Sequence, residues 1–331
     1  MTSSRCKASS HLKRLRNGLV LATILLVSVS NAARSEYPAR PVKIIVPVAP
    51  GGGTDIMARL LAHRLSERLG QQFIVENRPG AGGVVGAKSV IAARPDGLTL
   101  LYAPAALALT VITSKTPPYD LASDFTPIIN AAINPAVLVV HPSVPARTLT
   151  EFVAYGRAHS GKLSYGSPGV GTASHFAGEL LKADAGFDMV HVPNRGMTPS
   201  LNDLLSGQVQ VLFAGTTSVV SQGAGRMRPI AVAEMKRSGL LPDLPTMDQA
   251  GLPGFEVGNW AGLLGPASLG PDIVRKLNGE ILAILKIPDV QERVRVMGFD
   301  IVGSTPTQFA TQLQEDIRRW SRIAAFVRKD Q

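Results

Sequence analysis

The chain has 331 residues, of which 45% are hydrophobic and 18% charged, and its formal net charge is +10 at pH 7. Five Lys and Arg and no Asp or Glu lie in the first 32 residues, so the net charge of the rest of the chain is only +5. This small positive charge, with no long run of basic residues, argues against a nucleic-acid-binding surface. The length of the chain suffices for two domains of ordinary size.

Residues 1–32 have the three parts of a secretory signal peptide. Basic residues from Arg5 to Arg16 precede the apolar run Leu19–Val29, and Ser30-Asn31-Ala32 provides a cleavage site, with cleavage expected after Ala32. An uncleaved membrane anchor is the alternative, but the run is much shorter than the ~20 residues that a membrane span needs. We therefore expect a cleaved signal peptide and export to the periplasm. Cys6, the only cysteine, is lost with it, so the mature protein can form no intrachain disulfide and has no cysteine for a lipid anchor.

Strand and helix patterns alternate from residue 42 onward. Val42–Val46 is a β-branched run that predicts a buried strand, and an apolar stripe from Met57 to Leu69 predicts a helix that Thr54 caps and Gly70 ends. Further strands are expected at Phe73–Val75, Thr99–Tyr102, Ile128–Ile133 and Ala136–Val140, and a helix is expected to end at Ala93. The break at Asn134-Pro135 indicates a crossing between two lobes.

The alternation continues in the second half of the chain. Thr148 and Glu151 form a capping box at the start of a helix, and Thr305 and Gln308 form another. Strands are expected at Leu163–Tyr165, Val190–Val192, Val209–Phe213 and Ile230–Ala233, and helices at Thr172–Ala185 and Thr198–Leu205 and from Pro271, Asp289 and Pro306 onward. Such alternation predicts an α/β fold with open, parallel sheets, in which ligands bind at the carboxyl ends of the strands.

The first loop that could bind a ligand, residues 48–55, connects the first strand to the first helix. Three consecutive glycines, Gly51 to Gly53, let the backbone approach a ligand, and the helix start offers unpaired N–H groups and a partial positive charge. The loop has neither the lysine of a P-loop nor the glycine spacing of a dinucleotide site, so a carboxylate fits it better than a polyphosphate. The alternative is that the glycines only form a tight turn.

A second loop, Ser167 to His175, repeats this pattern in the other half of the chain. It runs from a strand through Gly169 and Gly171 to a helix start with the hydroxyl of Thr172. Two such anion-binding loops suit a ligand with two acidic or polar ends. Asn77–Gly83 is either a third such helix start or a plain surface turn.

The residues that could carry catalysis are few. Ser167 is not in a Gly-x-Ser-x-Gly elbow, and His175 and Asp55 lie in first helical turns, where capping is the usual role. The histidines are scattered singly and no cysteine accompanies them, so we expect no metal site, no cofactor and no enzyme activity. A hydrolase or isomerase that uses Ser167 or His175 remains the alternative.

Several motifs resemble one family along the whole mature chain. They are Pro50-Gly51-Gly52-Gly53-Thr54-Asp55, Glu76-Asn77-Arg78-Pro79-Gly80-Ala81-Gly82-Gly83, Pro95-Asp96-Gly97, Gly169-x-Gly171-Thr172-x-Ser174-His175, His191-Val192-Pro193 and Trp260. With them the sequence resembles the Bug family, or TctC-like receptors, the periplasmic solute-binding components of tripartite tricarboxylate transporters.

The resemblance implies a type II periplasmic binding protein, in which two α/β lobes close on a ligand cleft. It implies a first lobe of residues 33–134 plus 258–331 and a second lobe of residues 135–257. The expected ligand-binding residues lie in the loops on either side of this cleft. By position they are Ala49, Pro50, Gly51, Gly52, Thr54, Asp55, Ala103, Ala105, Asn134, Ser167, Gly169, Gly171, Thr172, His175, Asn194 and Ala214.

The sequence departs from the family pattern at two of these positions. Asn194 replaces a common Tyr before Arg195-Gly196, and Ala214 replaces a common Asp after Phe213. Loss of an acid at position 214 disfavours a cationic amine on the solute, which favours a plain carboxylic acid over an amino acid.

The expected function is therefore capture of a small di- or tricarboxylate or a related organic acid, for delivery to membrane permease subunits or to a sensor protein. The resemblance implies a monomer. A purely structural exported protein is a further alternative, which binding of any dicarboxylate would exclude.

Overall fold

The computed structural model describes residues 37–222 and 225–324. The predicted signal peptide, residues 1–32, lies outside these residues. Residues 40–331 belong to one compact unit that contains both sheets described below.

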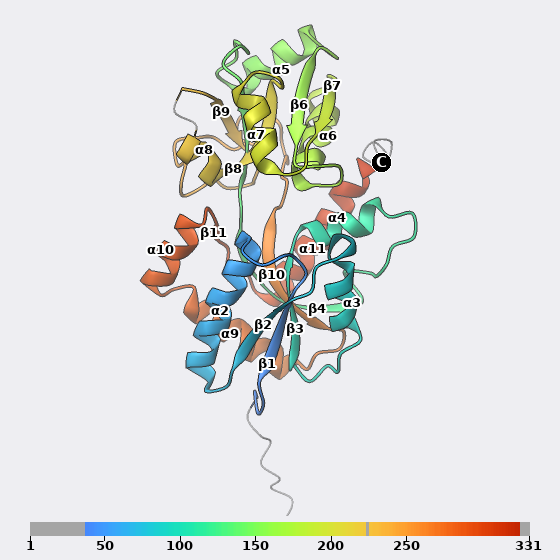
Figure 1. The fold of residues 1–331 in the computed structure, drawn as a ribbon, viewed down its shortest axis with the longest axis vertical. Coiled ribbons are helices and arrows are strands. Elements are labelled where there is room, and N and C mark those ends of the chain that lie inside the picture. The colour runs from blue at the N-terminus through green and yellow to red at the C-terminus, as the bar shows by residue number, and fades with distance from the viewer. Residues whose placement is uncertain (1–36, 223–224, 325–331) are drawn as a thin grey trace, which may run out of the picture. The chain divides into compact units, whose positions relative to one another are not determined.

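The first sheet has six strands in the order β11-β4-β10-β3-β1-β2 (Figure 1). Its strands are β1 (Val42–Val46), β2 (Phe73–Asn77), β3 (Thr99–Pro104), β4 (Phe125–Ile133), β10 (Trp260–Pro266) and β11 (Asp300–Ile301). Strands β1, β2 and β3 are parallel, as the alternating pattern predicts. Strand β10 is antiparallel to both β3 and β4, a direction that the alternating pattern did not predict.

The second sheet has five strands in the order β7-β6-β8-β5-β9. Its strands are β5 (Ala136–Val140), β6 (Leu163–Ser167), β7 (Met189–Pro193), β8 (Val211–Gly215) and β9 (Arg228–Val232). Strands β6, β7 and β8 are parallel, whereas β5 is antiparallel to β8 and β9.

The antiparallel strands follow from the two crossings between the sheets. The chain leaves the first sheet after β4 and enters the second at β5, and it returns to the first at β10. The crossings lie side by side, because Asn134 N–H donates to the Asn259 carbonyl at 2.9 Å and Asn259 Nδ2 donates to the Asn134 carbonyl at 3.2 Å. A strand that enters a sheet at the edge where another leaves it must run in the opposite direction. This is why β10 opposes β4.

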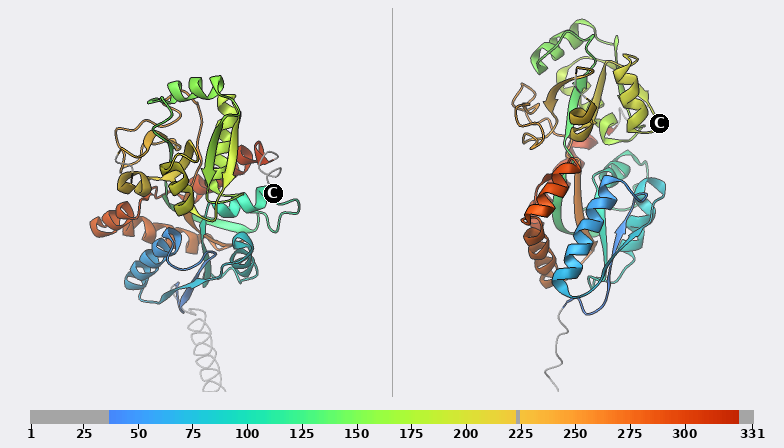
Figure 2. Two further views of the ribbon diagram at one scale, coloured as in Figure 1. Left: turned by 45° about the horizontal axis from the view of Figure 1, so that its top comes forward. Right: turned by 60° about the vertical axis from the view of Figure 1, so that its left-hand side comes forward.

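Helices connect the parallel strands, as expected. They are α2 (Gly53–Leu69), α3 (Val84–Ile91), α4 (Ala106–Thr113), α5 (Leu149–Ala158), α6 (Ala173–Ala185), α7 (Met197–Leu205), α8 (Thr216–Gln222), α9 (Pro271–Ile284), α10 (Pro288–Val296) and α11 (Pro306–Ser321), with a short 3₁₀ helix at Ala81–Gly83. Helices α2 and α9 lie side by side (Figure 2), with Arg68 of α2 paired to Glu280 of α9.

The caps of these helices follow the sequence in most cases. Both predicted capping boxes form, with Thr148 and Thr305 as the N-caps of α5 and α11. The expectation that Thr54 caps α2 was wrong, because the N-cap is Gly52 and no side chain caps this helix. Within residues 37–222 and 225–324, no helix is both long and apolar enough to span a bilayer.

Candidate functional site

The predicted binding residues of the first sheet lie along one edge. Strands β1 and β3 are parallel, so their carboxyl ends meet at the same edge. Residues 49–55 follow β1, and Ala103 and Ala105 lie at the end of β3. The sequence alone therefore placed these loops correctly relative to the strands.

The same holds for the second sheet. Ser167 ends β6, Asn194 follows β7, and Ala214 lies next to the last residue of β8. These three strands are parallel, so these residues share one carboxyl edge.

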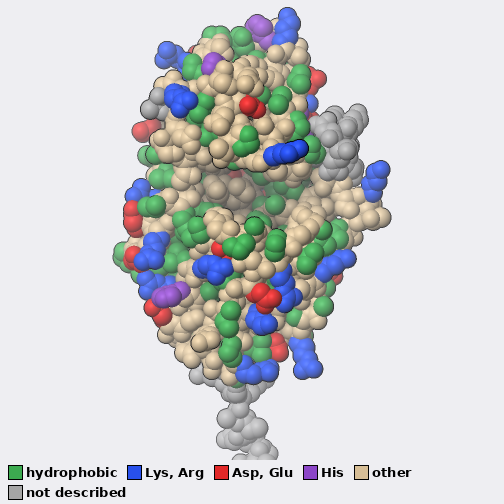
Figure 3. All heavy atoms as spheres, in the orientation of Figure 1, with side chains coloured by type: hydrophobic (Ala, Val, Ile, Leu, Met, Phe, Trp, Pro, Cys, Tyr) green, Lys and Arg blue, Asp and Glu red, His purple; other side chains and the backbone are tan. Residues whose placement is uncertain are grey.

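Asn134 lies where the two edges approach each other. It is in the first crossing, directly between the last residue of β4 and the start of β5, where Ala136 pairs with Gly215 at the end of β8. On the other side, Ala105 N–H donates to the Trp260 carbonyl at the start of β10. Both edges therefore border the crossings, and Figure 3 shows the surface hollowed between the two groups of elements, with mainly uncharged side chains and backbone in the hollow.

A buried carboxylate shapes the first loop. Asp55 is only 2% exposed, and its Oδ2 accepts the Gly51 N–H at 2.9 Å and Arg59 Nε at 3.0 Å. Its Oδ1 accepts Asn77 Nδ2 at 2.8 Å, and the same Nδ2 donates to the Val48 carbonyl. Burial alone would raise the pKa of Asp55, but the hydrogen bonds from Arg59, Gly51 and Asn77 outweigh it and lower the pKa. Asp55 thus fastens the loop to its own helix.

The start of α2 keeps backbone amides available. The first intrahelical bond is from Ile56 N–H to the Gly52 carbonyl, so the amides of Gly53 and Thr54 precede the hydrogen-bond ladder. Gly52 has ordinary φ of −80°, and a Cβ placed there would meet no heavy atom within 4 Å. Neither backbone conformation nor packing inside the protein requires a glycine at this exposed position. A glycine would be required at position 52 if another molecule approached the backbone closely there.

The second loop uses more of its amides within the protein. Gly169 N–H donates to Ser167 Oγ, Gly171 N–H donates to His175 Nδ1, and Thr172 N–H donates to the Gly169 carbonyl. The Thr172 hydroxyl accepts His175 N–H as the N-cap of α6. The expectation that these glycine amides are free is therefore not met at Gly169 and Gly171, because both already have acceptors in the loop.

Three stacked side-chain rings, those of Tyr165, His191 and His175, support this second loop. The His175 and His191 rings lie 3.9 Å apart at an angle of 9°, and Tyr165 stacks on His191 at 4.8 Å. Tyr165 Oη donates to Glu179 Oε1 at 2.7 Å. Ser167 Oγ lies 2.7 Å from Nε2 of His191, a histidine that the sequence analysis did not pair with it. Both Ser167 and His175 are 0% exposed, which leaves neither accessible to a substrate in this arrangement.

Three predicted residues, Ala103, Ala105 and Ala214, are 0% exposed, so neither their side chains nor their backbones are accessible to a ligand in this arrangement. The side chains of Ala103, Ala105 and Ala214 are fully buried in the hydrophobic core. Asn194 has a different constraint, because its Nδ2 donates to Asp203 Oδ2 at 2.8 Å and its N–H donates to the Ser167 carbonyl.

The structure adds residues that sequence analysis did not select. Asn77 and Arg59 hold Asp55, and Asn77 lies in the loop that the sequence analysis left between a third helix start and a plain turn. The ring of Phe299 lies against Gly53, and the neighbouring Gly298 carbonyl accepts the hydroxyl of Thr216 at 3.1 Å. These contacts bring the starts of α2 and α8 together. No sequence pattern signals them, because residues far apart in the chain make them.

A metal centre finds no support in the described ranges. Residues 37–222 and 225–324 contain no group of three or more His, Cys, Asp or Glu side chains placed to hold a metal ion. The site is built from helix starts, amides and hydroxyl groups.

Known proteins resemble this chain along most of its length. Residues 57–327 match the sequence model of the tripartite tricarboxylate transporter family receptor. The protein BugT of Bordetella pertussis is 33% identical over 309 residues, which cover 92% of this chain and 94% of BugT.

Two solved structures from Rhodopseudomonas palustris share the fold. Rpa4515 with adipate is 33% identical with a TM-score of 0.72, and the match covers 88% of this chain and 98% of that one. MatC with bound malate is also 33% identical, with a TM-score of 0.69 over 87% of this chain and 100% of MatC. This chain therefore belongs to the Bug family of periplasmic solute-binding proteins, the receptors of tripartite tricarboxylate transporters.

Proposed function

We propose that this protein binds one small carboxylate between the carboxyl edges of its two sheets and delivers it to the membrane permease subunits of a tripartite tricarboxylate transporter. The observation that carries the proposal is the uncapped start of α2. There, Gly52 is open to solvent and the amides of Gly53 and Thr54 precede the helix hydrogen bonds. Such a helix start favours an anion through its N–H groups and its partial positive charge.

Asn134 supports the proposal from the crossing. Its Oδ1 is buried and has no hydrogen-bond partner among the described residues, and it lies 3.4 Å from where a Cβ of Gly215 would be. A side-chain amide can present either its oxygen or its NH₂ group after a half turn. Asn134 can therefore donate to a second carboxylate oxygen of the ligand.

The second loop has a positioning role in this proposal. Its amides at Gly169 and Gly171 are already bonded within the loop, so it offers a rigid wall rather than a second set of free donors. Rigid walls reduce the conformational entropy lost on binding. The solute class is proposed from the open α2 start together with the adipate and malate bound by the two similar proteins.

A receptor that performs no chemistry fits the environment of Ser167 better than a hydrolase does. Ser167 Oγ also exchanges hydrogen bonds with the backbone of Gly169, and the side chain is fully buried. A serine nucleophile has to reach its substrate, and here its hydroxyl serves the loop.

The test is isothermal titration calorimetry of the mature protein with malate, adipate and other mono-, di- and tricarboxylates. We expect at least one to bind, and Gly52→Asp to weaken its affinity by about tenfold or more, because the new carboxylate faces the anion. Gly279→Asp is the matched control. It introduces the same charge at an exposed glycine of α9 whose Cβ would also meet nothing within 4 Å.

Two results would contradict the proposal. One is that no carboxylate in the series binds. The other is that Gly52→Asp and Gly279→Asp bind with equal affinity. Turnover of any bound ester or acid that His175→Ala abolishes would favour the enzyme alternative instead.

A further inference from the structure

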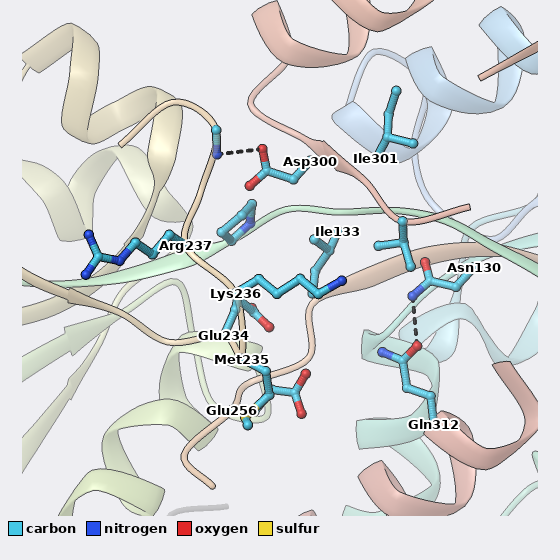
Figure 4. Close-up of a pocket in the computed structure, with 13 residues that line it drawn as sticks. Asn130, Ile133, Glu234, Met235, Lys236, Arg237, Glu256, Asp300, Ile301 and Gln312 are labelled. Atoms are coloured by element: carbon cyan, nitrogen blue, oxygen red, sulfur yellow. Dashed lines mark hydrogen bonds between the residues drawn. The ribbon is translucent and has the colours of Figure 1, made fainter. Parts of the chain in front are cut away.

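A second cavity lies beside the crossings, and none of the predicted binding residues lines it. Its volume is about 420 Å³ (Figure 4). Strands β4 and β11 of the first sheet, helix α11 and both crossings contribute residues to it: Asn130, Ile133, Pro135, Glu234, Met235, Lys236, Arg237, Gly239, Glu256, Asp300, Ile301, Val302 and Gln312.

Two buried side chains leave acceptor atoms without a partner in this cavity. Asn130 is 1% exposed, and its Nδ2 donates to Gln312 Oε1 at 2.8 Å, but its Oδ1 has no partner among the described residues. Glu234 is 3% exposed, and its Oε2 accepts the Gly258 N–H at 3.3 Å, but its Oε1 likewise has none. Buried polar atoms are nearly always paired, so two unpaired ones in one cavity point to a molecule that supplies donors.

A cationic side chain, that of Lys236, also lines this cavity. Lys236 extends over the cavity toward Asn130 in Figure 4, and within the described ranges it makes neither an ion pair nor a hydrogen bond. The neighbouring Arg237 differs, because it donates to Gln249 Oε1 and to the Pro242 carbonyl. An unengaged ammonium group at the mouth of a cavity is suited to a carboxylate.

The rest of the wall has an apolar, partly exposed part and two acids that already have partners: Glu256 pairs with Arg319, and Asp300 Oδ1 accepts the Gly239 N–H. Met235, Ile301 and Val302 expose 46%, 36% and 43% of their surface. Small-molecule sites typically combine apolar walls with a few polar groups, which fix the orientation of the ligand.

We propose that this cavity is a second ligand site, which binds a small hydroxy acid with its carboxylate on Lys236 and its hydroxyl groups on Asn130 Oδ1 and Glu234 Oε1. A hydroxyl suits Glu234 better than an ammonium group does. Burial raises the pKa of Glu234 well above its ordinary value and so favours the neutral carboxyl group. Because Pro135 belongs to the first crossing and Glu234 to the second, the occupant of this site contacts both crossings.

The experiment uses racemic glycerate as the probe and the mature Gly52→Asp protein, in which binding at the start of α2 is expected to be weakened. We expect calorimetry to show saturable binding of glycerate in this background. Adding Lys236→Met should weaken it by about tenfold or more, since a charge-assisted hydrogen bond is lost, and Lys236→Arg should retain most of the affinity. Lys286→Met, at an exposed lysine outside the cavity, should leave it unchanged.

The proposal is overturned if Gly52→Asp abolishes all glycerate binding, or if Lys236→Met binds as tightly as the Lys286→Met control. It is also overturned if crystals of the Gly52→Asp protein soaked in glycerate hold only water in the cavity. Because Lys236 is exposed and makes no ion pair or hydrogen bond within the described ranges, the variant is expected to fold, which its melting temperature checks.

Discussion

Asp55 makes contacts in the structure that its position in the sequence did not reveal. The sequence places it in the first turn of α2, where an acid is ordinarily a capping or dipole residue. In the structure it instead accepts three hydrogen bonds and holds Gly51 and Asn77 around the helix start.

We predict that Asp55→Ala lowers the free energy of unfolding at pH 7 by about 2–4 kcal/mol, because three hydrogen bonds to a buried charge are lost. Asp289→Ala is the control, since its partners Arg64 and Arg293 form exposed ion pairs that contribute at most about 1 kcal/mol. Urea denaturation measures both. Equal losses in the two variants would show that Asp55 does not fasten the loop.

The same carboxylate gives a dependence on pH. The pKa of Asp55 in the folded protein is lowered below its unfolded value of about 3.9. Its stabilisation is therefore complete above the unfolded pKa and is lost as the pH falls through the folded pKa. The stability difference between wild type and Asp55→Ala should shrink with acidification in this range. A difference that is constant from pH 7 to pH 3 would contradict this.

At the scale of single elements, local sequence signals predicted most helices and strands. Both capping boxes are formed, and β1 has the bounds Val42–Val46 that its pattern predicted. The signal failed at α2, where Gly52 rather than Thr54 is the N-cap. An uncapped start leaves its amides to be satisfied by other partners.

This difference between the helices can be measured. We predict that Thr148→Ala and Thr305→Ala each lower the free energy of unfolding by about 1 kcal/mol, the usual contribution of an N-cap side chain. Thr54→Ala should change it by much less, because no cap bond is lost. Thermal denaturation of the three variants is the measurement. A loss at Thr54 as large as at Thr148 would restore the capping role that the sequence suggested.

At the scale of the whole molecule, the second crossing and helix α11 bring a cluster of acids together. Glu234 is buried, and the nearby carboxyl groups of Glu256 and Asp316 add to the effect of burial in raising its pKa. Burial also raises the pKa of Asp316 to about 8, although Arg319 donates to it and opposes the rise. Trp260 Nε1 donates to Asp316 Oδ2 at 3.0 Å, which ties the cluster to the start of β10.

The raised pKa of Glu234 predicts how stability changes with pH. A carboxyl group whose folded pKa exceeds its unfolded value binds more protons in the folded state, so stability falls as the pH rises between the two values. Glu234→Gln cannot ionise, and we expect it to be more stable than wild type at pH 8, by a margin that disappears at pH 4. Denaturation at both pH values tests this, with Glu67→Gln on an exposed part of α2 as the control. A margin that does not vary with pH would refute the assignment.

The candidate site shows the same division between local and distant causes. Glycine-rich loops after β1 and β6 could be placed at the carboxyl edges because each depends on neighbouring residues in the chain. The pairing of Ser167 with His191, the contact of Phe299 with Gly53 and the burial of Ala214 could not, because segments far apart in the sequence create them. The apolar run Trp260–Pro266 was a strand signal that the sequence analysis left unused.

The sequence by itself determined the strand–helix alternation, the glycine-rich helix starts and the family to which the chain belongs, because these depend on residues within a few positions of one another or on motifs. Only the tertiary structure decided which amides are still available, which histidine meets Ser167 and that β10 runs against its neighbours. A backbone amide that donates to another group of the protein is not available to a ligand. Which amides have such a partner is decided only when segments far apart in the sequence pack together.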